Sequence, residues 1–240
     1  MINITMLYNN IPQHPALTTG WGLSCLIEGA EKTILFDTGG DGKILLSNLK
    51  RLKKDPLKVD TVVLSHVHGD HTGGLEEFLT VAGDVEFYVP GSFPVQFIKG
   101  AEDMGYKVTA VDKSVAICKS LFSTGQMGAE IKEQALVLKA SGGLVVIMGC
   151  AHPGLVNMLK KAKQVGADDI YLAMGGFHLM EYLDHEIKEV IQTLKGLGLK
   201  NIAPSHCTGN RPTHMFKDAW QNNFIQMGCG AHLTVSACEA

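Results

Sequence analysis

Residues 61–74 read TVVLSHVHGDHTGG, a short apolar run that leads into a dense group of polar side chains. The run TVVL has the β-branched composition of a buried strand. Directly after it, His66, His68, Asp70 and His71 bring three imidazoles and one carboxylate close together. Neutral imidazole and carboxylate suit Zn, Fe, Ni or Mn, whereas a core or a plain turn makes poor use of such a cluster. The stretch predicts a strand followed by a metal-binding loop.

The same arrangement recurs along the chain, because VVIM, IYLAM and NIAPS are each followed within four residues by a histidine. These histidines are His152, His178 and His206. Ligands of open α/β sheets bind beyond the carboxyl ends of strands, so loops far apart in sequence can meet at one pocket. We therefore expect the three histidines to join the loop at 66–71.

The rest of the chain alternates Val- and Ile-rich runs with helix-period segments, which is typical of an α/β protein. LSCLIE and KTILF predict a hairpin, and further strands are predicted at TVVLS, VEFYV, KVTAV, ALVLK, LVVIM, IYLAM and HLTV. Helices are predicted over 44–52 and 157–165, over 187–197 after an Asp184 cap, and around 216–220 after Thr213. Residues 91–134 show no regular period, and we expect a loop or flap over a site there.

Composition narrows the class of protein further. The 240 residues are 45% hydrophobic and 19% charged, and no linker or repeat divides them, so we expect a single domain over residues 1–240. A formal charge of −3 argues against a nucleic-acid partner. Without a basic leader or a run of about 18 apolar residues, we expect a cytoplasmic protein with no membrane partner. Six cysteines with no CxxC pair are expected to be reduced thiols.

The loop at 66–71 resembles the signature of the metallo-β-lactamase fold superfamily, H-x-H-x-D-H after a strand. The preceding ILFDTG, which contains Asp37, resembles the strand and turn that support this metal loop. More narrowly, GLSCLIE, ILFDTGG, LSHVHGDHTGGL, QALVL, MGCAHPGLVN, MGGFHL and PSHCTG look like the metal-dependent hydrolase group labelled 7,8-dihydropterin-6-methyl-4-(β-D-ribofuranosyl)aminobenzene 5'-phosphate synthase. These blocks occur in the same order over nearly the whole chain.

This resemblance implies an α/β fold, namely a four-layered αβ/βα sandwich in which two mixed β-sheets are flanked by helices, with a dinuclear metal site at one edge. Carried over by position, one divalent ion would be bound by His66, His68 and His152, and the other by Asp70, His71 and His206. Zinc is the expected metal, with iron or manganese as alternatives. Asp37 would support the metal loop from behind.

The chain departs from the superfamily pattern at His178, where most hydrolases of the superfamily have an aspartate that bridges the two ions. A neutral imidazole cannot bridge in that way, so His178 is either a terminal ligand or an acid that faces the substrate. We favour the acid. The bridge would then be mainly water or hydroxide, and occupancy of the second site is an open question.

Two divalent ions about 3.5 to 4 Å apart can hold a hydroxide and polarise a phosphoryl or carbonyl oxygen. We therefore expect a metal-dependent hydrolase, such as a phosphoesterase, that uses a metal-bound hydroxide on a small phosphorylated or ester-containing metabolite. Asp70 would ligate and orient the attacking water, and His178 would stabilise developing charge or protonate the leaving group. The expected partner is a small-molecule substrate, and the sequence does not specify an oligomeric state.

Three other functions are alternatives to hydrolysis. The first alternative is a transferase of the dihydropterin synthase type in pterin cofactor biosynthesis, and the second is a non-catalytic metal-dependent effector or sensing module. Redox di-iron chemistry ranks lower, because superfamily members that reduce oxygen or nitric oxide replace the second histidine of the motif with glutamate and carry a flavin domain. This chain has His68 at that position.

Several residues near the motifs have two interpretations. Cys207, beside His206, is either a soft ligand or a packing residue, and Arg211 is a candidate for gripping a phosphate. Trp21 and Phe177 are candidates for lining the base of a pocket that binds a planar ring, although core packing is the favoured interpretation. The remaining histidines, at positions 14, 185, 214 and 232, are interpreted as surface or core residues.

Overall fold

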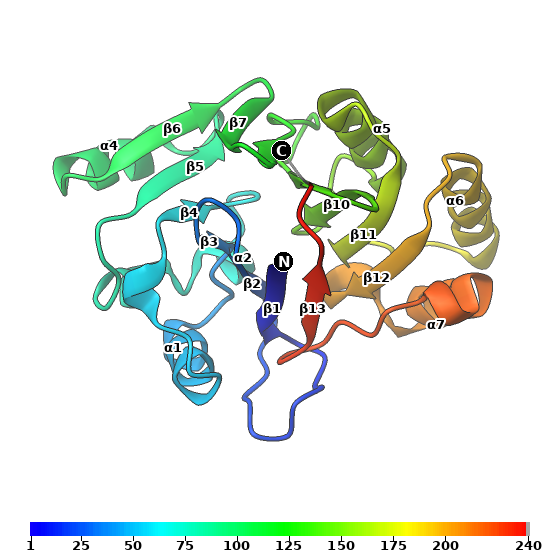
Figure 1. Cartoon of the computed structure of the whole chain (residues 1–240), viewed down its shortest axis with the longest axis horizontal. Helices are drawn as coiled ribbons and strands as arrows, with labels where there is room; N and C mark the ends of the chain where they lie inside the picture. The colour runs from blue at the N-terminus through cyan, green and yellow to red at the C-terminus, as the bar shows by residue number, and fades with distance from the viewer. Residues whose placement is uncertain (239–240) are drawn as a thin grey trace.

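The computed structural model describes residues 1–238, which form two β-sheets that pack face to face with helices on both outer sides (Figure 1). The first sheet has the strand order β13 (His232–Val235), β1 (Ile2–Asn9), β2 (Leu23–Glu28), β3 (Ile34–Phe36), β4 (Thr61–Val63), β5 (Glu86–Pro90) and β6 (Lys107–Val111). The second has the order β12 (Asn201–Ser205), β11 (Ile170–Gly176), β10 (Gly143–Met148), β9 (Leu136–Ala140), β8 (Leu121–Ser123) and β7 (Val115–Cys118).

Both sheets are mixed. Strands β3, β4, β5 and β6 are parallel neighbours in the first sheet, and β10, β11 and β12 are parallel neighbours in the second. The remaining strand pairs are antiparallel. The parallel strands of one sheet therefore end at a common edge, which is where ligands of α/β proteins bind.

Helices cover the outer face of each sheet, as Figure 1 shows. Those of the first half are α1 (Gly42–Arg51), α2 (Gly69–Thr72), α3 (Leu75–Leu79) and α4 (Val95–Asp103), and those of the second half are α5 (Leu155–Gly166), α6 (Asp184–Gly196) and α7 (Asn210–Trp220). Single 3₁₀ turns lie at η1 (Pro56–Lys58), η2 (His206–Thr208) and η3 (Gln221–Asn223). The fold is the expected αβ/βα sandwich.

Three apolar layers hold the sandwich together. Between the sheets, residues such as Phe36 and Ile147 are fully buried. Behind the second sheet, α5 presents Leu155, Met158, Leu159 and Ala162, a stripe at helical spacing that faces the core. Behind the first sheet, buried side chains of α1 and α3 pack on β4 and β5. Each sheet thus has two apolar faces, which explains its continuous hydrophobic runs.

The predicted strands and helices are confirmed, with shifts at their ends. Helix α6 begins at Asp184, and its cap is Leu183, whose N–H donates to Glu186 Oε2 at 2.7 Å; the Asp184 cap is therefore wrong. Helix α7 begins at Asn210, ahead of the predicted start, because Gly209 takes a positive φ of 85° and ends the preceding turn.

Residues 91–134 contain α4, β6, β7 and β8, so the expected flap is wrong. Helix α4 buries none of its residues fully, and β6 and β7 are edge strands with partly exposed side chains. Strand β6 was predicted at KVTAV, whereas α4 and β7 were missed, because weak burial removes the strong apolar periodicity from which they could have been predicted.

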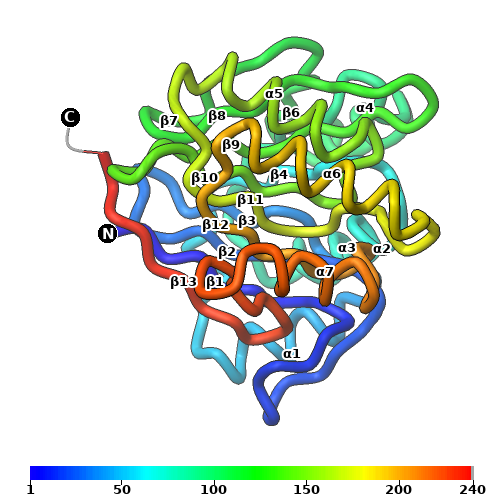
Figure 2. Tube along the Cα trace, turned by 90° about the vertical axis from the view of Figure 1, so that its right-hand side faces the viewer, coloured from blue at the N-terminus to red at the C-terminus, as the bar shows by residue number. Residues whose placement is uncertain are grey.

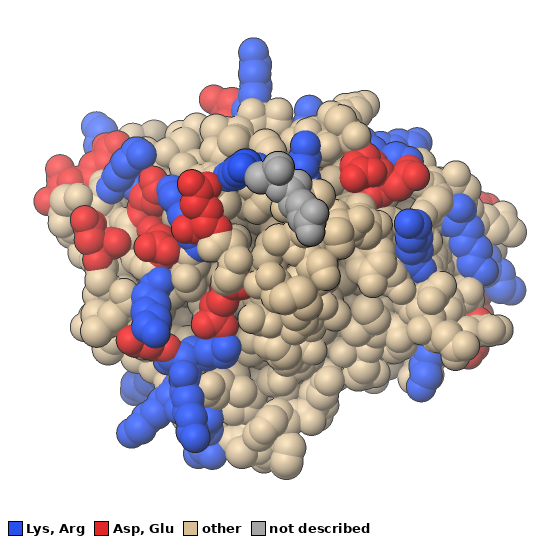
Figure 3. Space-filling view, in the orientation of Figure 1, with Lys and Arg blue, Asp and Glu red and all other residues tan. Residues whose placement is uncertain are grey.

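The two ends of the first sheet carry different parts of the chain. In Figure 2, the start of β1 and the end of β13 lie on one side, while α2 and α3 lie on the other. Among the described residues, the helices are too short or too polar for any of them to span a bilayer. On the face in Figure 3, acidic and basic side chains are mixed around the periphery, apart from a small basic group at the lower left.

Candidate metal centre

Loops from both sheets meet at one edge, each at the carboxyl end of a strand. His66 follows β4, His152 follows β10, His178 follows β11 and His206 follows β12. The ring centroids of His66 and His152, which come from different sheets, are 4.8 Å apart. The expected convergence of the histidine loops is therefore present in the fold.

One group of donor atoms consists of His66, His68 and His152, whose ring nitrogens all lie within 4.8 Å of one another. His66 Nε2 and His68 Nδ1 are 3.1 Å apart. His66 is fully buried, whereas His68 and His152 are partly exposed toward the edge of the sandwich. These three residues are the ones that the resemblance assigns to the first ion.

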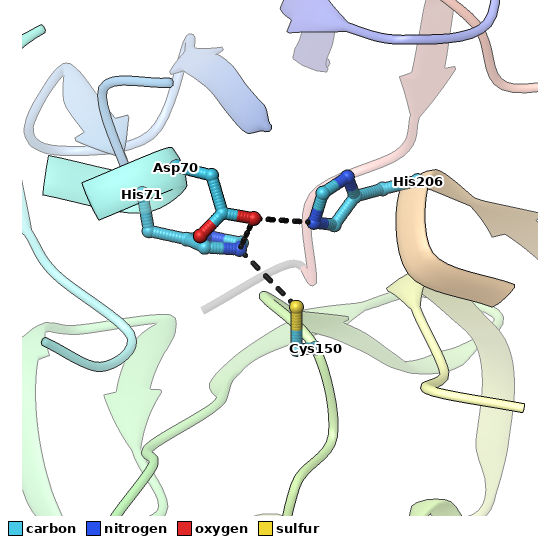
Figure 4. Close-up of side chains that lie close together, drawn as sticks. All are labelled: Asp70, His71, Cys150 and His206. Carbon is cyan, nitrogen blue, oxygen red and sulfur yellow. Dashed lines mark hydrogen bonds and ion pairs between the residues drawn. The ribbon is translucent and has the colours of Figure 1, made fainter. Parts of the chain in front are cut away.

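The second group consists of Asp70, His71, Cys150 and His206, again with all donor atoms within 4.8 Å (Figure 4). Asp70 Oδ2 lies 3.2 Å from His206 Nε2 and 3.6 Å from His71 Nε2. Cys150 Sγ lies 3.2 Å from His71 Nε2. Three of these residues were predicted for the second ion, and Cys150 was not.

These separations, 3.1–3.6 Å, lie within a few tenths of an ångström of those expected around a shared metal ion. Around a tetrahedral zinc ion with bonds of about 2.0–2.2 Å to nitrogen and oxygen and about 2.3 Å to sulfur, neighbouring donors lie roughly 3.3–3.6 Å apart. Among the described residues, His152 Nε2 and His206 Nε2 are also buried without a hydrogen-bond partner. Of these two nitrogens, His206 Nε2 lies 3.2 Å from Asp70 Oδ2, whereas His152 Nε2 has no such contact. Because buried polar atoms are normally paired, the lone nitrogen of His152 indicates that a ligand completes it. The residues present therefore fit a divalent metal.

Asp37 lies behind the donor residues and holds His71 and the backbone of Ser65 in place. It follows β3, is fully buried, and accepts the Ser65 N–H at Oδ1 and both the Ser65 hydroxyl and His71 Nδ1 at Oδ2, each at 2.7 Å. With the proton of His71 on Nδ1, its Nε2 keeps a lone pair for the centre. The predicted support from Asp37 is thus a direct carboxylate–imidazole contact.

Equivalent contacts fix two more rings. His206 Nδ1 donates to Asn10 Oδ1 at 2.9 Å, and the Ser65 hydroxyl oxygen lies 2.9 Å from His66 Nδ1. In each case the hydrogen bond at Nδ1 leaves Nε2 as the lone-pair nitrogen. The hydrogen bonds at Nδ1 therefore fix the ring orientations that metal binding through Nε2 requires.

The loop that carries Cys150 and His152 is held by Glu133, a residue that the sequence did not single out. Its buried carboxylate accepts the backbone N–H groups of Cys150, Ala151 and His152 at 2.8–2.9 Å. Burial raises the pKa of Glu133 to about 7, although these hydrogen bonds oppose the shift. No local pattern marks Glu133, because its contacts are made only in the folded chain.

Electrostatics keep the donors in the forms that bind metals. Burial lowers the pKa of His66, and burial together with His178 lowers the pKa of His152 to about 4, so both imidazoles are neutral at pH 7. Burial alone would raise the pKa of Asp70, but the imidazoles of His206 and His71 outweigh it and the pKa falls below its usual value. Metal ligands must be neutral imidazoles and ionised carboxylates, and these shifts favour that state for His66, His152 and Asp70.

Backbone strain collects at the same edge. Asp37, Ala151, His178 and His206 all have φ between 50° and 57°, a left-handed conformation that is uncommon outside glycine. Such residues persist where the surrounding structure fixes them, and they cluster at functional sites. The backbone at Gly149 packs closely against the Ser65 side chain, since a Cβ at position 149 would lie 2.2 Å from Ser65 Oγ.

His178 lies at the solvent side of the centre. Its side chain is exposed, its ring centroid is 4.4 Å from that of His152, and its donor nitrogen lies within 4.8 Å of Cys150 Sγ. Cys207 raises the pKa of His178, against the effect of partial burial. This position is compatible with either interpretation made from the sequence, a terminal ligand or an acid facing substrate.

Two small cavities of about 190 and 200 Å³ flank His178. The second is lined by Trp21, Met180 and Tyr182, which are 52%, 48% and 38% exposed. Trp21 therefore faces a pocket, contrary to the favoured interpretation of core packing. Phe177 is buried against Phe216, as expected of a core residue.

The two remaining candidates lie beside the centre. Cys207 is buried, and its sulfur packs 3.7 Å from the carbonyl oxygen of Cys150. Arg211 is exposed and already engaged, with Nη1 3.2 Å from Asp184 Oδ1 and Nη2 donating to the carbonyl of Tyr182. The four histidines at positions 14, 185, 214 and 232 are exposed surface residues, as interpreted from the sequence.

Known proteins are similar to this chain in sequence and in fold. Residues 20–102 match the family model of the metallo-beta-lactamase superfamily. The chain is 29% identical to the 7,8-dihydropterin-6-methyl-4-(beta-D-ribofuranosyl)-aminobenzene-5'-phosphate synthase of Methanocaldococcus jannaschii, over 87% of this chain and 88% of the relative. The crystal structure of Tm1679, a metal-dependent hydrolase of the beta-lactamase superfamily, is similar with a TM-score of 0.79 and 26% identity over 98% of this chain and 100% of that one.

A more distant structure shares the fold alone. The metallo-beta-lactamase fold protein YhfI from Bacillus subtilis has a TM-score of 0.68 at 14% identity, over 97% of this chain and 98% of that one. The fold of these proteins suggests divalent metal binding at the edge where the donors converge. The chain therefore has the metallo-β-lactamase fold, and its residues 20–102 match the family model of that superfamily.

Proposed function

We propose that the protein is a metal-dependent hydrolase that acts on a small phosphorylated or ester-containing metabolite. The observation that carries this proposal is the meeting of two donor groups at one edge, with spacings that suit coordination and with the buried Nε2 of His152 left without a hydrogen-bond partner. The similarity to Tm1679, which is described as a metal-dependent hydrolase, supports it.

The proposed centre contains two divalent ions, with zinc as the preferred metal and iron or manganese as alternatives. One ion would be held by His66, His68 and His152, and the other by Asp70, His71 and His206. When bound, such ions supply a water of lowered pKa and a positive charge that polarises a phosphoryl or carbonyl oxygen.

The chain's own residues position the reactants. The Asp70 carboxylate is kept ionised by its imidazole neighbours, so it can both bind an ion and accept a hydrogen bond that orients the attacking water. His178, exposed beside the cavities, holds a proton on its imidazole for the leaving group. The strained backbone at both His178 and His206 fixes their rings relative to the rest of the centre.

The cavity next to His178 supports a substrate with a flat apolar part. Trp21, Met180 and Tyr182 offer apolar surface there, and Arg211 is paired with Asp184 instead of facing the cavity as a free cation. An anionic or ester end of the substrate would then depend on the metal centre, and the organic part on this apolar rim.

A dihydropterin synthase-type transfer is the second candidate. It is supported by the curated relative at 29% identity, whose name includes a pterin and an aminobenzene ring. Both rings are planar, and the exposed Trp21 at the cavity suits stacking on such a ring. Transfer requires two organic substrates, whereas hydrolysis requires one and water, so product analysis separates the two.

The test of hydrolysis starts from protein loaded with zinc, manganese or iron. Initial rates are measured on bis(nitrophenyl) phosphate, nitrophenyl phosphate, a thioester and a lactone, with and without chelator. We expect turnover of at least one class, lost on chelation and in His68→Ala. His185→Ala is the matched control, because His185 is exposed on α6 away from the donor groups, and it should keep the wild-type rate.

Two results would contradict these proposals. Absence of turnover in every class with metal bound would favour a non-catalytic effector or sensing module. If His68→Ala retained both ions and the full rate, the assignment of the first donor group would be wrong.

The role of His178 is tested by counting metals in His178→Ala. The proposed acid role predicts an unchanged metal content with a rate lowered by about 10²–10⁴-fold, which is the usual contribution of general acid catalysis. Loss of one metal equivalent would instead make His178 a ligand.

A further inference from the structure

The Cys150 sulfur lies close to donor atoms of two different groups. It belongs to the group formed with Asp70, His71 and His206, and also to a group formed with His152 and His178. It is therefore a donor atom shared between groups on the two sides of the centre. Apart from Asp70, the other members of these groups are imidazoles, which carry no negative charge when they bind metals.

The loop geometry fixes the sulfur at this place. Glu133 holds the backbone N–H groups of Cys150 and of the two residues after it, and Ala151 has a positive φ of 57°. Cys150 is 3% exposed, so its sulfur faces the donors instead of solvent. Cys207, whose sulfur lies 3.7 Å from the carbonyl oxygen of Cys150, belongs to none of these donor groups.

The neighbouring ring is also prepared for a shared ligand. His71 donates Nδ1–H to Asp37, so its Nε2, 3.2 Å from the sulfur, is an acceptor. Without an ion, the Cys150 thiol can donate to this nitrogen. An ion between the two atoms would replace that hydrogen bond by two metal bonds, and about 3.6 Å is the nitrogen–sulfur separation expected around tetrahedral zinc.

We propose that Cys150 is a thiolate ligand of the metal centre, supplying a second anionic donor beside Asp70 at the place where the two donor groups meet. The inference rests on the proposed metal centre and extends it to a ligand of different chemistry. Thiolate is a soft donor, so its presence favours zinc or iron over manganese, which prefers oxygen ligands.

Coordination has to displace the thiol proton. In the absence of an ion, the adjacent Cys207 and burial both raise the pKa of Cys150. A thiol that coordinates a divalent metal loses its proton outright, because the ion's charge reverses the effect of burial.

The test replaces the native metal with cobalt(II), whose spectrum separates the donor types. Metal-free wild type, Cys150→Ser and Cys207→Ser are each titrated with cobalt(II) alone. We expect wild type and Cys207→Ser to show visible d–d bands together with a near-ultraviolet thiolate-to-cobalt charge-transfer band. In Cys150→Ser the charge-transfer band should be lost while the d–d bands of the histidine sites persist.

The outcomes separate the ligand proposal from the proposed centre. Visible bands without a charge-transfer band in wild type, or a charge-transfer band that persists in Cys150→Ser, would overturn the Cys150 ligand and leave the metal centre intact. Loss of the band in Cys207→Ser alone would move the ligand to Cys207. Absence of any cobalt band in wild type would overturn the metal centre as well.

A measurement on wild type alone covers the case in which Cys150→Ser does not fold. X-ray absorption at the zinc edge of the zinc-loaded protein should contain a sulfur shell at about 2.3 Å in addition to nitrogen and oxygen at about 2.0–2.2 Å. A spectrum fitted fully by nitrogen and oxygen would refute the thiolate ligand.

Discussion

Asp37→Asn removes one oxygen from the support of the metal centre without changing the backbone. Asp37 has φ 56°, a conformation that asparagine also adopts readily. The Asn oxygen can still accept the Ser65 N–H, and the Ser65 hydroxyl can reverse to accept from the new amide. His71 cannot adapt in this way, because its Nδ1–H would face an N–H group.

His71 then has two options, and both weaken the centre. It can lose the 2.7 Å hydrogen bond, or it can move its proton to Nε2 and give up the lone pair that faces Asp70 and Cys150. Removing such a supporting carboxylate costs about 10–100-fold in metal affinity, or roughly 1.4–2.8 kcal/mol. The lost charged hydrogen bond should also lower the free energy of unfolding of the metal-free protein by about 1.5–3 kcal/mol.

The assay is a competition titration with a metallochromic chelator, followed by urea unfolding of the chelated protein. We expect one metal equivalent to bind about 10–100-fold more weakly in Asp37→Asn, with a smaller change for the other equivalent. The matched control is Asp41→Asn, at the exposed cap of α1, where asparagine caps as well as aspartate. If Asp37→Asn bound both equivalents with wild-type affinity, the proposed role of the Asp37–His71 contact would be refuted.

Three further predictions concern packing, pH and metal. In Gly149→Ala the new Cβ would clash with Ser65 Oγ, so urea unfolding should show that the free energy of unfolding falls by about 1–3 kcal/mol. The control Gly100→Ala lies in open space within α4 and should raise the free energy of unfolding by about 0.5–1 kcal/mol. Equal changes in the two variants would contradict the packing argument. Burial raises the pKa of Glu86, but Lys32 and Lys107 outweigh this effect and lower the pKa overall. The ionised Glu86 therefore stabilises the folded protein at pH values above 4.5, its pKa in the unfolded chain, and this stabilisation is lost as the pH falls through the folded-state pKa. Glu86→Gln should therefore lower the free energy of unfolding by up to about 1 kcal/mol at neutral pH and leave it unchanged under acid conditions; a pH-independent difference would exclude the ion pair as its cause. Zinc at about 100 times its dissociation constant should stabilise the protein by about 2.7 kcal/mol in a thermal melt, and chelator should reverse this; an unchanged melt would mean that zinc does not bind the folded state.

The sequence predicted the strand ends well because burial on both faces leaves a continuous apolar run, and a histidine directly after such a run stands out. It did not predict β1, since Asn3, Thr5 and Asn9 interrupt the apolar pattern even though most of the strand is buried. Helix α4 was missed for the opposite reason, because it is only partly buried and leaves no strong period.

Within the site, the residues that sequence reasoning missed are those whose role depends on tertiary contacts. Cys150 lies two residues before His152, but a cysteine beside a strand is commonly a small core residue, and only the fold turns its sulfur toward His71. Glu133 comes from a loop before β9 and contacts the 150–152 backbone, which is distant in sequence, only in the folded chain. Trp21 was assigned to the core because aromatic residues usually pack there, whereas the structure leaves it exposed beside His206, at a centroid distance of 4.9 Å.

The measurement that tests the metal centre most directly is anomalous diffraction from crystals of the zinc-loaded protein, with data collected above and below the zinc edge. The account predicts two peaks, one bonded to His66 Nε2, His68 Nδ1 and His152 Nε2 and the other to the group containing Asp70 and His206, with metal–nitrogen and metal–oxygen distances of about 2.0–2.2 Å. Zinc peaks elsewhere on the molecule, or no peak between these side chains, would contradict it.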